Sequence, residues 1–183
     1  PQLPAEFRIT FWTDTPAVPG QVGSFSHPNK CVWMVSCTNY TYEFVGWDVD
    51  PRDTNAVPEA CFLFHQEFST NEWFRQELFG EPGLSSNIFW VSIAASYQLS
   101  YPEYPWGWKT RPRDLDSPAP DDAVRIYDPT APLPGLPYVS GQPIFWPDWT
   151  NSWDMAFYLT TRAHEDQDFA DAPNTYPTLL ANT

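Results

Sequence analysis

The densest group of chemically active side chains is an acidic run that follows a predicted strand. Asp48, Asp50 and Asp53 lie close together in the sequence, beside Trp47 and Arg52. Carboxylate oxygens are the ligands that Ca²⁺ prefers, so these three could surround one ion in a loop. An Asx or proline turn, in which Arg52 pairs with a neighbouring carboxylate, accounts for the same residues without a metal. Calcium at this run is the only cofactor that we expect.

Aromatic side chains gather in two proline-containing loops, residues 101–108 and 145–149. Flat indole faces stack on sugar rings, and neighbouring carboxylates accept hydrogen bonds from hydroxyl groups. The residues of such a glycan-binding face would be Tyr104, Trp106, Trp108, Trp146 and Trp149. Packing in the core or at a subunit interface is the alternative, because ten tryptophans in one small domain cannot all bind ligands.

The histidines are scattered rather than grouped for catalysis. His27, His65 and His164 stand outside the His-x-x-x-His and His-Glu-x-x-His patterns that are typical of metal sites. The sequence has neither a Gly-x-Ser-x-Gly nucleophile elbow nor a phosphate-binding glycine loop. A glycosidase needs only two carboxylates at a suitable distance in space. The chain has 23 Asp and Glu residues, and their spacing in the sequence does not exclude such a pair. We therefore expect no enzyme.

A second charged group, residues 111–116 with Asp121 and Asp122, lies in a proline-stiffened stretch. Its arginines can form ion pairs with the acidic run at residues 48–53. Such pairs would clamp two connections at one end of the domain, so we expect a structural role for this loop.

The three cysteines bear on the cellular compartment. Cys31 and Cys37 lie on one predicted strand, about 20 Å apart at about 3.3 Å per residue, which is too far for a bridge. Cys61 is therefore the partner that they would share. A Cys31–Cys61 disulfide is favoured, because a simple meander places both at the same end of neighbouring strands. Three reduced, buried cysteines are the alternative.

Asn39 opens the one N-x-S/T sequon of the sequence, at a predicted hairpin, and is the glycosylation candidate.

The composition predicts one folded, acidic domain. The chain has 183 residues, of which 42% are hydrophobic and 17% aromatic, enough for one core. Its net charge of -14, with only nine Lys and Arg residues, repels nucleic acid and anionic lipid surfaces. No apolar run approaches the roughly 20 residues that span a bilayer, so we expect no membrane insertion. Glycans, divalent cations and other proteins remain as partners.

The 21 prolines exclude long helices, because each removes an amide donor and clashes with the preceding turn. Aromatic and β-branched runs instead predict ten strands, at residues 6–13, 31–37, 42–47, 61–68, 73–77, 87–97, 106–109, 123–127, 142–146 and 153–161. We expect an all-β fold, a two-sheet antiparallel sandwich of jelly-roll type. The run 87–97 is apolar on both faces and should be central, whereas alternate residues of 153–159 should face the core. Residues 69–79, with Glu72 near the start, are the one helical turn expected.

We expect a single domain over residues 1–163, with its core at about 6–161, and an acidic, proline-containing tail over residues 164–183. The first residues have neither the charged nor the apolar region of a signal peptide, so the chain reads as the mature form of a secreted protein. The tail is either a linker or an extended arm that lies on another surface.

The pattern F-x-G-W-D-x-D-P-R-D occurs at residues 44–53, and further matching stretches lie at residues 105–112, 119–126 and 152–157. Together they resemble a family of exported bacterial domains that lacks an assigned function, over about residues 6–161. Members often end in a PEP-CTERM sorting tail, so the resemblance implies a place at the cell surface or in the extracellular matrix. This chain departs from that pattern at residues 170–183, which do not have the character of such a tail.

These observations favour a non-enzymatic extracellular protein of structural or assembly type. It would be the repeating subunit of a surface filament or layer, with itself or other surface proteins as partners. Residues 1–13 or 170–183 would add a strand to the sheet edge of a neighbouring subunit. A carbohydrate-binding module that uses the loop tryptophans is the alternative function.

Overall fold

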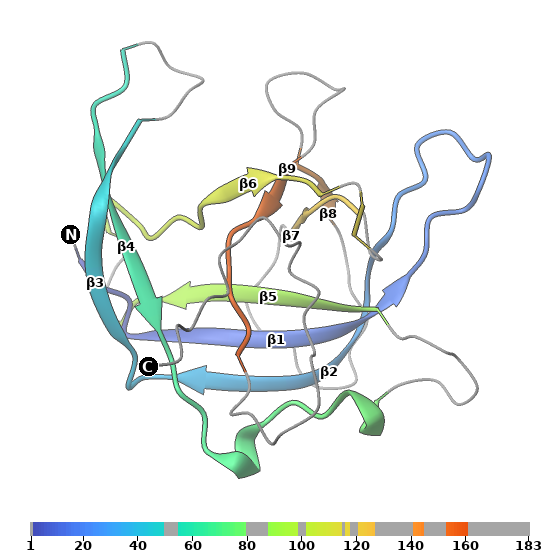
Figure 1. Ribbon diagram of the computed structural model, residues 1–183, viewed down its shortest axis with the longest axis horizontal. Helices are drawn as coiled ribbons and strands as arrows, with labels where there is room; N and C mark the ends of the chain where they lie inside the picture. The colour runs from blue at the N-terminus through green and yellow to red at the C-terminus, as the bar shows by residue number, and fades with distance from the viewer. Residues whose placement is uncertain are drawn as a thin grey trace, which may run out of the picture.

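The computed structural model describes residues 2–49, 55–79, 88–98, 102–114, 116–117, 121–126, 141–144 and 153–160. In these ranges the chain forms several antiparallel sheets and two single turns of 3₁₀ helix (Figure 1). The all-β, sandwich-like class that the sequence predicts is confirmed. Neither helical turn in the described ranges has the length or the apolar character to cross a membrane.

The largest sheet has the order β2–β1–β5, with β1 at Glu6–Thr15, β2 at His27–Cys37 and β5 at Phe89–Ser96. Both neighbours run antiparallel to β1. Successive side chains of a strand point to opposite faces, and β1 buries Phe7 on one face and Thr10 and Trp12 on the other. The first long strand of the sequence is therefore the centre of the sheet.

The prediction that residues 87–97 form the central strand is wrong. Within the described residues β5 pairs with β1 alone, so it lies at an edge. Two indole hydrogen bonds join β5 to β1. Trp90 Nε1 donates to Asp14 Oδ1 at 2.7 Å, and Trp12 Nε1 donates to Ser92 Oγ at 3.0 Å. An apolar pattern on both faces indicates that a strand is covered on both sides. It does not indicate where the strand lies in the strand order of the sheet.

Aromatic rings cover the face of the central sheet that carries Phe11. Phe74 stacks on Phe11 with 4.1 Å between ring centroids, and it meets Phe89 of β5 edge-on at 5.1 Å. Phe74 lies between η1 (Thr70–Glu72) and η2 (Gln76–Leu78). Figure 1 shows these two helical turns below the central sheet. The segment that carries Phe74 is aromatic because it packs against a sheet.

The strand predicted at residues 73–77 is therefore wrong, whereas the helical turn predicted within residues 69–79 is confirmed. Ser69 caps η1, and both hydrogen bonds of a capping box with Glu72 are present. The cap satisfies amide groups that would otherwise lack partners at the start of the turn.

The next two strands, β3 (Thr41–Asp48) and β4 (Glu59–His65), form a two-stranded antiparallel hairpin that stands across one end of the central sheet (Figure 1). Val45 is the extra residue of a β-bulge, because the register passes from Phe44 opposite Phe62 directly to Gly46 opposite Cys61. Gly46 has a φ of 154°, which side-chain-bearing residues rarely adopt, so glycine permits this bulge.

Two small sheets complete the described fold: β6 (Thr110–Pro112) pairs with β9 (Trp153–Met155), and β7 (Val124–Ile126) pairs with β8 (Gly141–Pro143). The Ile144 amide donates to the Ala123 carbonyl at 2.8 Å, and the Ala123 amide donates to the Trp153 carbonyl at 3.2 Å. These bonds join the two pairs into one unit, above the central sheet in Figure 1.

The core-facing side predicted for residues 153–159 is wrong beyond Met155. β9 ends there, and Phe157 and Leu159 are exposed. Met155 lies opposite Thr110, the first residue of the three-residue strand β6, so β9 has no further strand to pair with beyond that point in the described residues.

The predicted Cys31–Cys61 disulfide is also wrong. Cys31, Cys37 and Cys61 are free thiols, and the first two are buried. Cys31 lies on β2 of the central sheet and Cys61 lies on β4 of the hairpin, and these strands are not neighbours. The strands do not follow the simple meander on which the pairing depended.

Candidate functional site

Trp106 and Trp108 lie in a chain of aromatic contacts. The Trp106 ring is 5.2 Å from that of buried Phe7 and 6.2 Å from that of Trp108, which in turn is 5.9 Å from Phe157. Trp108 Nε1 donates to the Ala156 carbonyl at 2.7 Å. Both tryptophans are half-buried, so their rings pack the loop onto the body of the domain.

The other predicted glycan-binding residues are placed differently. Tyr104 is largely exposed in the same loop. Trp146 and Trp149 lie outside the described residues. The structure thus brings Trp106 and Trp108 together in a packed cluster, and glycan binding by the five residues stays a prediction.

Large apolar side chains are instead exposed on the hairpin. We call this set the hairpin surface, and its exposed fractions run from 46% at Leu63 to 69% at Trp47. Its members are Tyr42, Phe44, Val45, Trp47 and Leu63. Tyr42, Phe44 and Trp47 share one face of the hairpin, and Leu63 lies on the other. A contiguous exposed apolar patch on a soluble domain marks a site of interaction with another molecule.

The register of the hairpin positions these aromatic rings. Because of the bulge at Val45, Trp47 returns to the face of Phe44, and their rings are 5.6 Å apart. Phe44 contacts Phe62 across the strands at 5.8 Å, and Tyr42 likewise contacts Phe64 at 6.0 Å. One face of the hairpin therefore carries a row of aromatic rings.

One end of this row is held by the core and the other is open. Phe64 packs edge-on against buried Phe7 at 5.1 Å. Tyr40, which precedes β3, also contacts Phe7 at 4.9 Å and donates its hydroxyl to the Pro4 carbonyl. The domain thus fixes the hairpin where β4 ends and presents the far end, with Trp47, to solvent.

The backbone of the hairpin is open as well. In the part of the chain that the structure describes, no third strand pairs with the outer edge of β3 or of β4. Such edges present unpaired amide and carbonyl groups, which another strand can satisfy.

Lys109 joins the hairpin to the loop before β6. Its Nζ donates to the Asp48 carboxylate in an ion pair. Burial alone would lower the Lys109 pKa, but the hydrogen bond to Asp48 and the negative charge there raise it overall. Lys109 lies outside the charged group at residues 111–116 for which the sequence predicts a clamp to residues 48–53, so this link to Asp48 is made by a residue that the prediction did not include. Arg111 pairs with Asp154, and Arg113 pairs with Asp122.

The predicted calcium site falls mostly outside the described residues. Asp50 and Asp53 lie outside the described residues. Asp48 forms an ion pair with Lys109 and accepts a hydrogen bond from the Val49 amide. Among the residues that are described, no three His, Cys, Asp or Glu side chains are grouped as metal ligands. Calcium binding stays a prediction.

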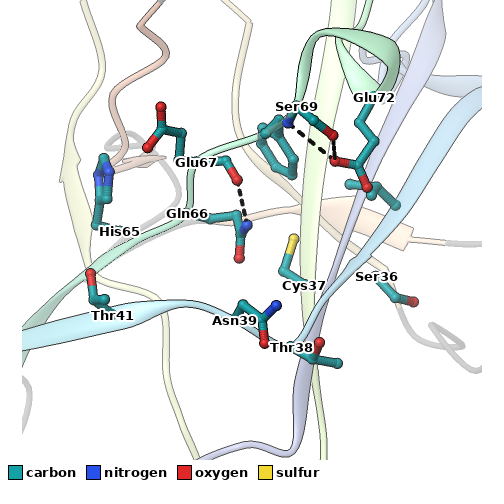
Figure 2. A pocket seen from close by; sticks show the side chains of 12 residues that line it. Ser36, Cys37, Thr38, Asn39, Thr41, His65, Gln66, Glu67, Ser69 and Glu72 are labelled. Atoms are coloured by element: carbon teal, nitrogen blue, oxygen red, sulfur yellow. Dashed lines mark hydrogen bonds between the residues drawn. The ribbon is translucent and has the colours of Figure 1, made fainter.

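Figure 2 shows a pocket of about 450 Å³ at the foot of the hairpin, between the end of β2, the start of β3 and η1. Cys37, His65 and Glu67 are among its lining residues. At its upper rim in the figure, the Ser69 amide and hydroxyl both donate to Glu72, and these bonds lower the pKa of that carboxyl.

This pocket is polar, and its described lining contains neither Lys nor Arg. The carboxylates of Glu67 and Glu72 disfavour an anion, and the many hydroxyl and amide groups suit a neutral, hydroxyl-bearing molecule. Asn39, the glycosylation candidate, is an exposed residue of the lining, and its modification stays a prediction.

Sequence reasoning missed the hairpin surface and the pocket. Tyr42 and Phe44 read as ordinary strand residues, because a period of two is the same for a buried and an exposed strand. An available signal was Gly46 inside a predicted strand, which indicates a bulge. The pocket is lined by two segments, within residues 35–41 and 65–72, that are distant in sequence and meet only in the folded chain.

Comparison with known protein families identifies the family of the chain. A family model described as Domain of unknown function (DUF7901) matches residues 1–160. Neither the curated proteins nor the solved structures contain a match to the chain.

Proposed function

This chain belongs to DUF7901, a family of domains of unknown function, and we propose that it is a non-enzymatic assembly protein of the cell exterior. The observation that carries the proposal is the hairpin surface on a two-stranded sheet that no other described strand joins. A two-stranded hairpin is marginally stable by itself, and further strands or packing stabilise it. A partner that adds a strand at an open edge of the hairpin would supply further strands and extend its apolar face.

The hairpin supports a protein partner in particular. Its aromatic row and its free edges offer both apolar area and backbone hydrogen bonds, the two components of binding by strand addition. The net charge of -14 disfavours nucleic acid and anionic membranes. Carbohydrate binding by the loop tryptophans has weaker support, because Trp106 and Trp108 are engaged in packing.

The N-terminal segment is a poor candidate for strand exchange. β1 lies between β2 and β5 and makes backbone pairs on both sides. Releasing it would dismantle the central sheet. The hairpin therefore takes the role that the sequence suggests for residues 1–13, and residues 170–183, outside the described residues, remain a second contact through which a filament or layer could grow.

The extracellular location rests on the resemblance to exported domains that often carry a PEP-CTERM tail. In that setting the protein would be a repeating subunit at the cell surface. Fractionation of the native host, with antibody against the domain, tests the location independently of assembly.

Association of the purified chain tests the proposal. We expect concentration-dependent self-association in sedimentation velocity at moderate salt, and we expect Leu63→Lys to weaken it at least tenfold. A lysine on an exposed edge strand must lose its hydration when a second strand is added, so it opposes such pairing.

The matched control is Val22→Lys, which adds the same charge at a fully exposed apolar residue in the loop between β1 and β2. It should associate like the unmodified chain. A chain that stays monomeric at every concentration, or equal effects of the two variants, would overturn the proposal.

A further inference from the structure

We propose that the partner of the hairpin is a second copy of this chain, and that the two β4 strands pair antiparallel about a two-fold axis at Phe62. This inference rests on the proposed assembly function and specifies its partner and its register. It follows from three features of the described hairpin. These are the regular edge of β4, the residues that lie opposite each other when two β4 strands pair antiparallel, and the edges of the sheet that results.

The regular edge is that of β4. β3 carries the bulge at Val45 and Gly46, and a bulge bends a strand and interrupts its ladder. β4 pairs with β3 over seven residues, Glu59–His65, without an extra residue of its own. An added strand needs such an uninterrupted row of backbone groups, so it would join at β4.

The sequence of β4 complements itself when reversed. With Phe62 opposite Phe62 of the second copy, Glu59 lies opposite His65, an acid opposite a base, at both ends of the interface. The imidazole of His65 can then donate a hydrogen bond to the Glu59 carboxylate. Cross-strand pairs of opposite charge stabilise a sheet.

Side-chain size is matched in the same register. Ala60 lies opposite Phe64, so the smallest side chain of the strand faces the ring that is already packed against Phe7. Cys61 lies opposite Leu63, which places a small apolar side chain beside an exposed one. No large side chain meets another large one except at the axis, where the two Phe62 rings meet.

The resulting sheet would have four strands in the order β3–β4–β4–β3. A two-fold axis perpendicular to the sheet keeps equivalent faces on the same side, so the aromatic rows of the two copies become continuous. Leu63 gains a neighbour on the opposite face. Both unpaired β4 edges disappear, and the bulged β3 edges remain outside, where bulges oppose further addition.

A charge exchange tests this register. Glu59→Lys removes the acceptor and places a cation opposite His65, and we expect dimerisation to weaken about three- to tenfold for the two symmetric pairs. The double variant Glu59→Lys/His65→Glu restores opposite charges in the same register, and we expect it to recover dimerisation. Both residues are exposed, so the fold should tolerate each change.

Cross-linking gives a second measurement that does not depend on affinity. Phe62→Cys in a Cys61→Ser background places a thiol on the proposed axis, and mild oxidation should yield a disulfide-linked dimer. Val22→Cys in the same background is the control for random collisions and should remain monomeric.

The outcomes separate the two proposals. If the unmodified chain does not associate, the proposed function fails and this inference fails with it. If the chain associates through the hairpin but the double variant does not recover and the thiol on the axis does not cross-link, the assembly function stands and the β4 register is overturned.

Discussion

At the scale of residues, the three thiols differ in what surrounds them. Cys31 and Cys37 are buried, whereas Cys61 is partly exposed on β4. Burial raises the pKa of the Cys37 thiol to about 11, and the nearby charges of Glu72 and Glu6 act in the same direction. The thiolate is the reactive form, so at pH 8 Cys37 holds about 100-fold less of it than a thiol with an ordinary pKa.

We predict that alkylation with iodoacetamide at pH 8 modifies Cys61 first, with Cys31 and Cys37 reacting at least tenfold more slowly. Peptide mass spectrometry over a time course measures each site. Because the Cys37 pKa is raised, its rate should keep increasing with pH up to about 11. Cys61→Ser should remove the fast phase. A fast phase that persists in this variant would show that the other thiols are open to solvent.

The same raised pKa makes the folding stability of the chain depend on pH through Cys37. The folded chain holds its proton more tightly than the unfolded chain, so the contribution is complete below the ordinary thiol pKa of 9.0 and is lost as pH rises towards about 11. Cys37 is therefore a buried structural residue at neutral pH, even though it borders the pocket.

At the scale of elements, Phe7 joins three parts of the chain. It lies on the central strand β1, and its ring meets Tyr40 beside the hairpin, Phe64 on β4 and Trp106 in the loop before β6. Each contact is edge-on, an arrangement that aromatic pairs prefer. Phe7 therefore links the central sheet to the hairpin and to the loop before β6.

We predict that Phe7→Ala lowers the free energy of unfolding by about 3–5 kcal/mol, because it leaves a cavity where three rings meet. Urea unfolding followed by tryptophan fluorescence measures it. Phe44→Ala, which truncates an exposed ring on the same aromatic row, is the matched control and should cost about 1 kcal/mol or less. Similar losses for the two variants would contradict the anchoring role of Phe7.

The sequence predicts where these elements lie better than how they are ordered. The strand expected at residues 6–13 is β1, Glu6–Thr15, because alternation and aromatic content are local properties. The pairing of β1 with β5 joins residues about eighty positions apart, as between Trp12 and Trp90, and no local pattern encodes it. The disulfide prediction failed for this reason, since it assumed that strands close in sequence are neighbours.

The candidate site was less predictable still. Trp106 and Trp47 are both tryptophans in aromatic-rich stretches, yet one packs against Phe7 and the other is mostly exposed. The difference arises from what covers each segment in three dimensions. A strand that lacks a covering layer has the same sequence signature as one that has it, so the hairpin surface emerges only from the arrangement of the sheets.

At the scale of the whole molecule, charge opposes the assembly that the hairpin favours. Each copy carries a net charge of -14, so two copies repel each other before the apolar surfaces meet. Salt screens this repulsion, since the Debye length falls from about 10 Å at 0.1 M to about 3 Å at 1 M. The apolar contact and the backbone hydrogen bonds between strands are not screened in this way.

We therefore predict that self-association strengthens at least tenfold between 0.05 M and 0.5 M NaCl, measured as the dimer dissociation constant by sedimentation equilibrium. Leu63→Lys provides the control, because it reduces the net charge and yet should associate at least tenfold more weakly than the unmodified chain at each salt concentration. Its behaviour separates screening at a specific edge from general salting-out, which would affect both proteins alike. Association that weakens as salt is added would mean that charge attraction holds the copies together, and the apolar hairpin would then not be the interface.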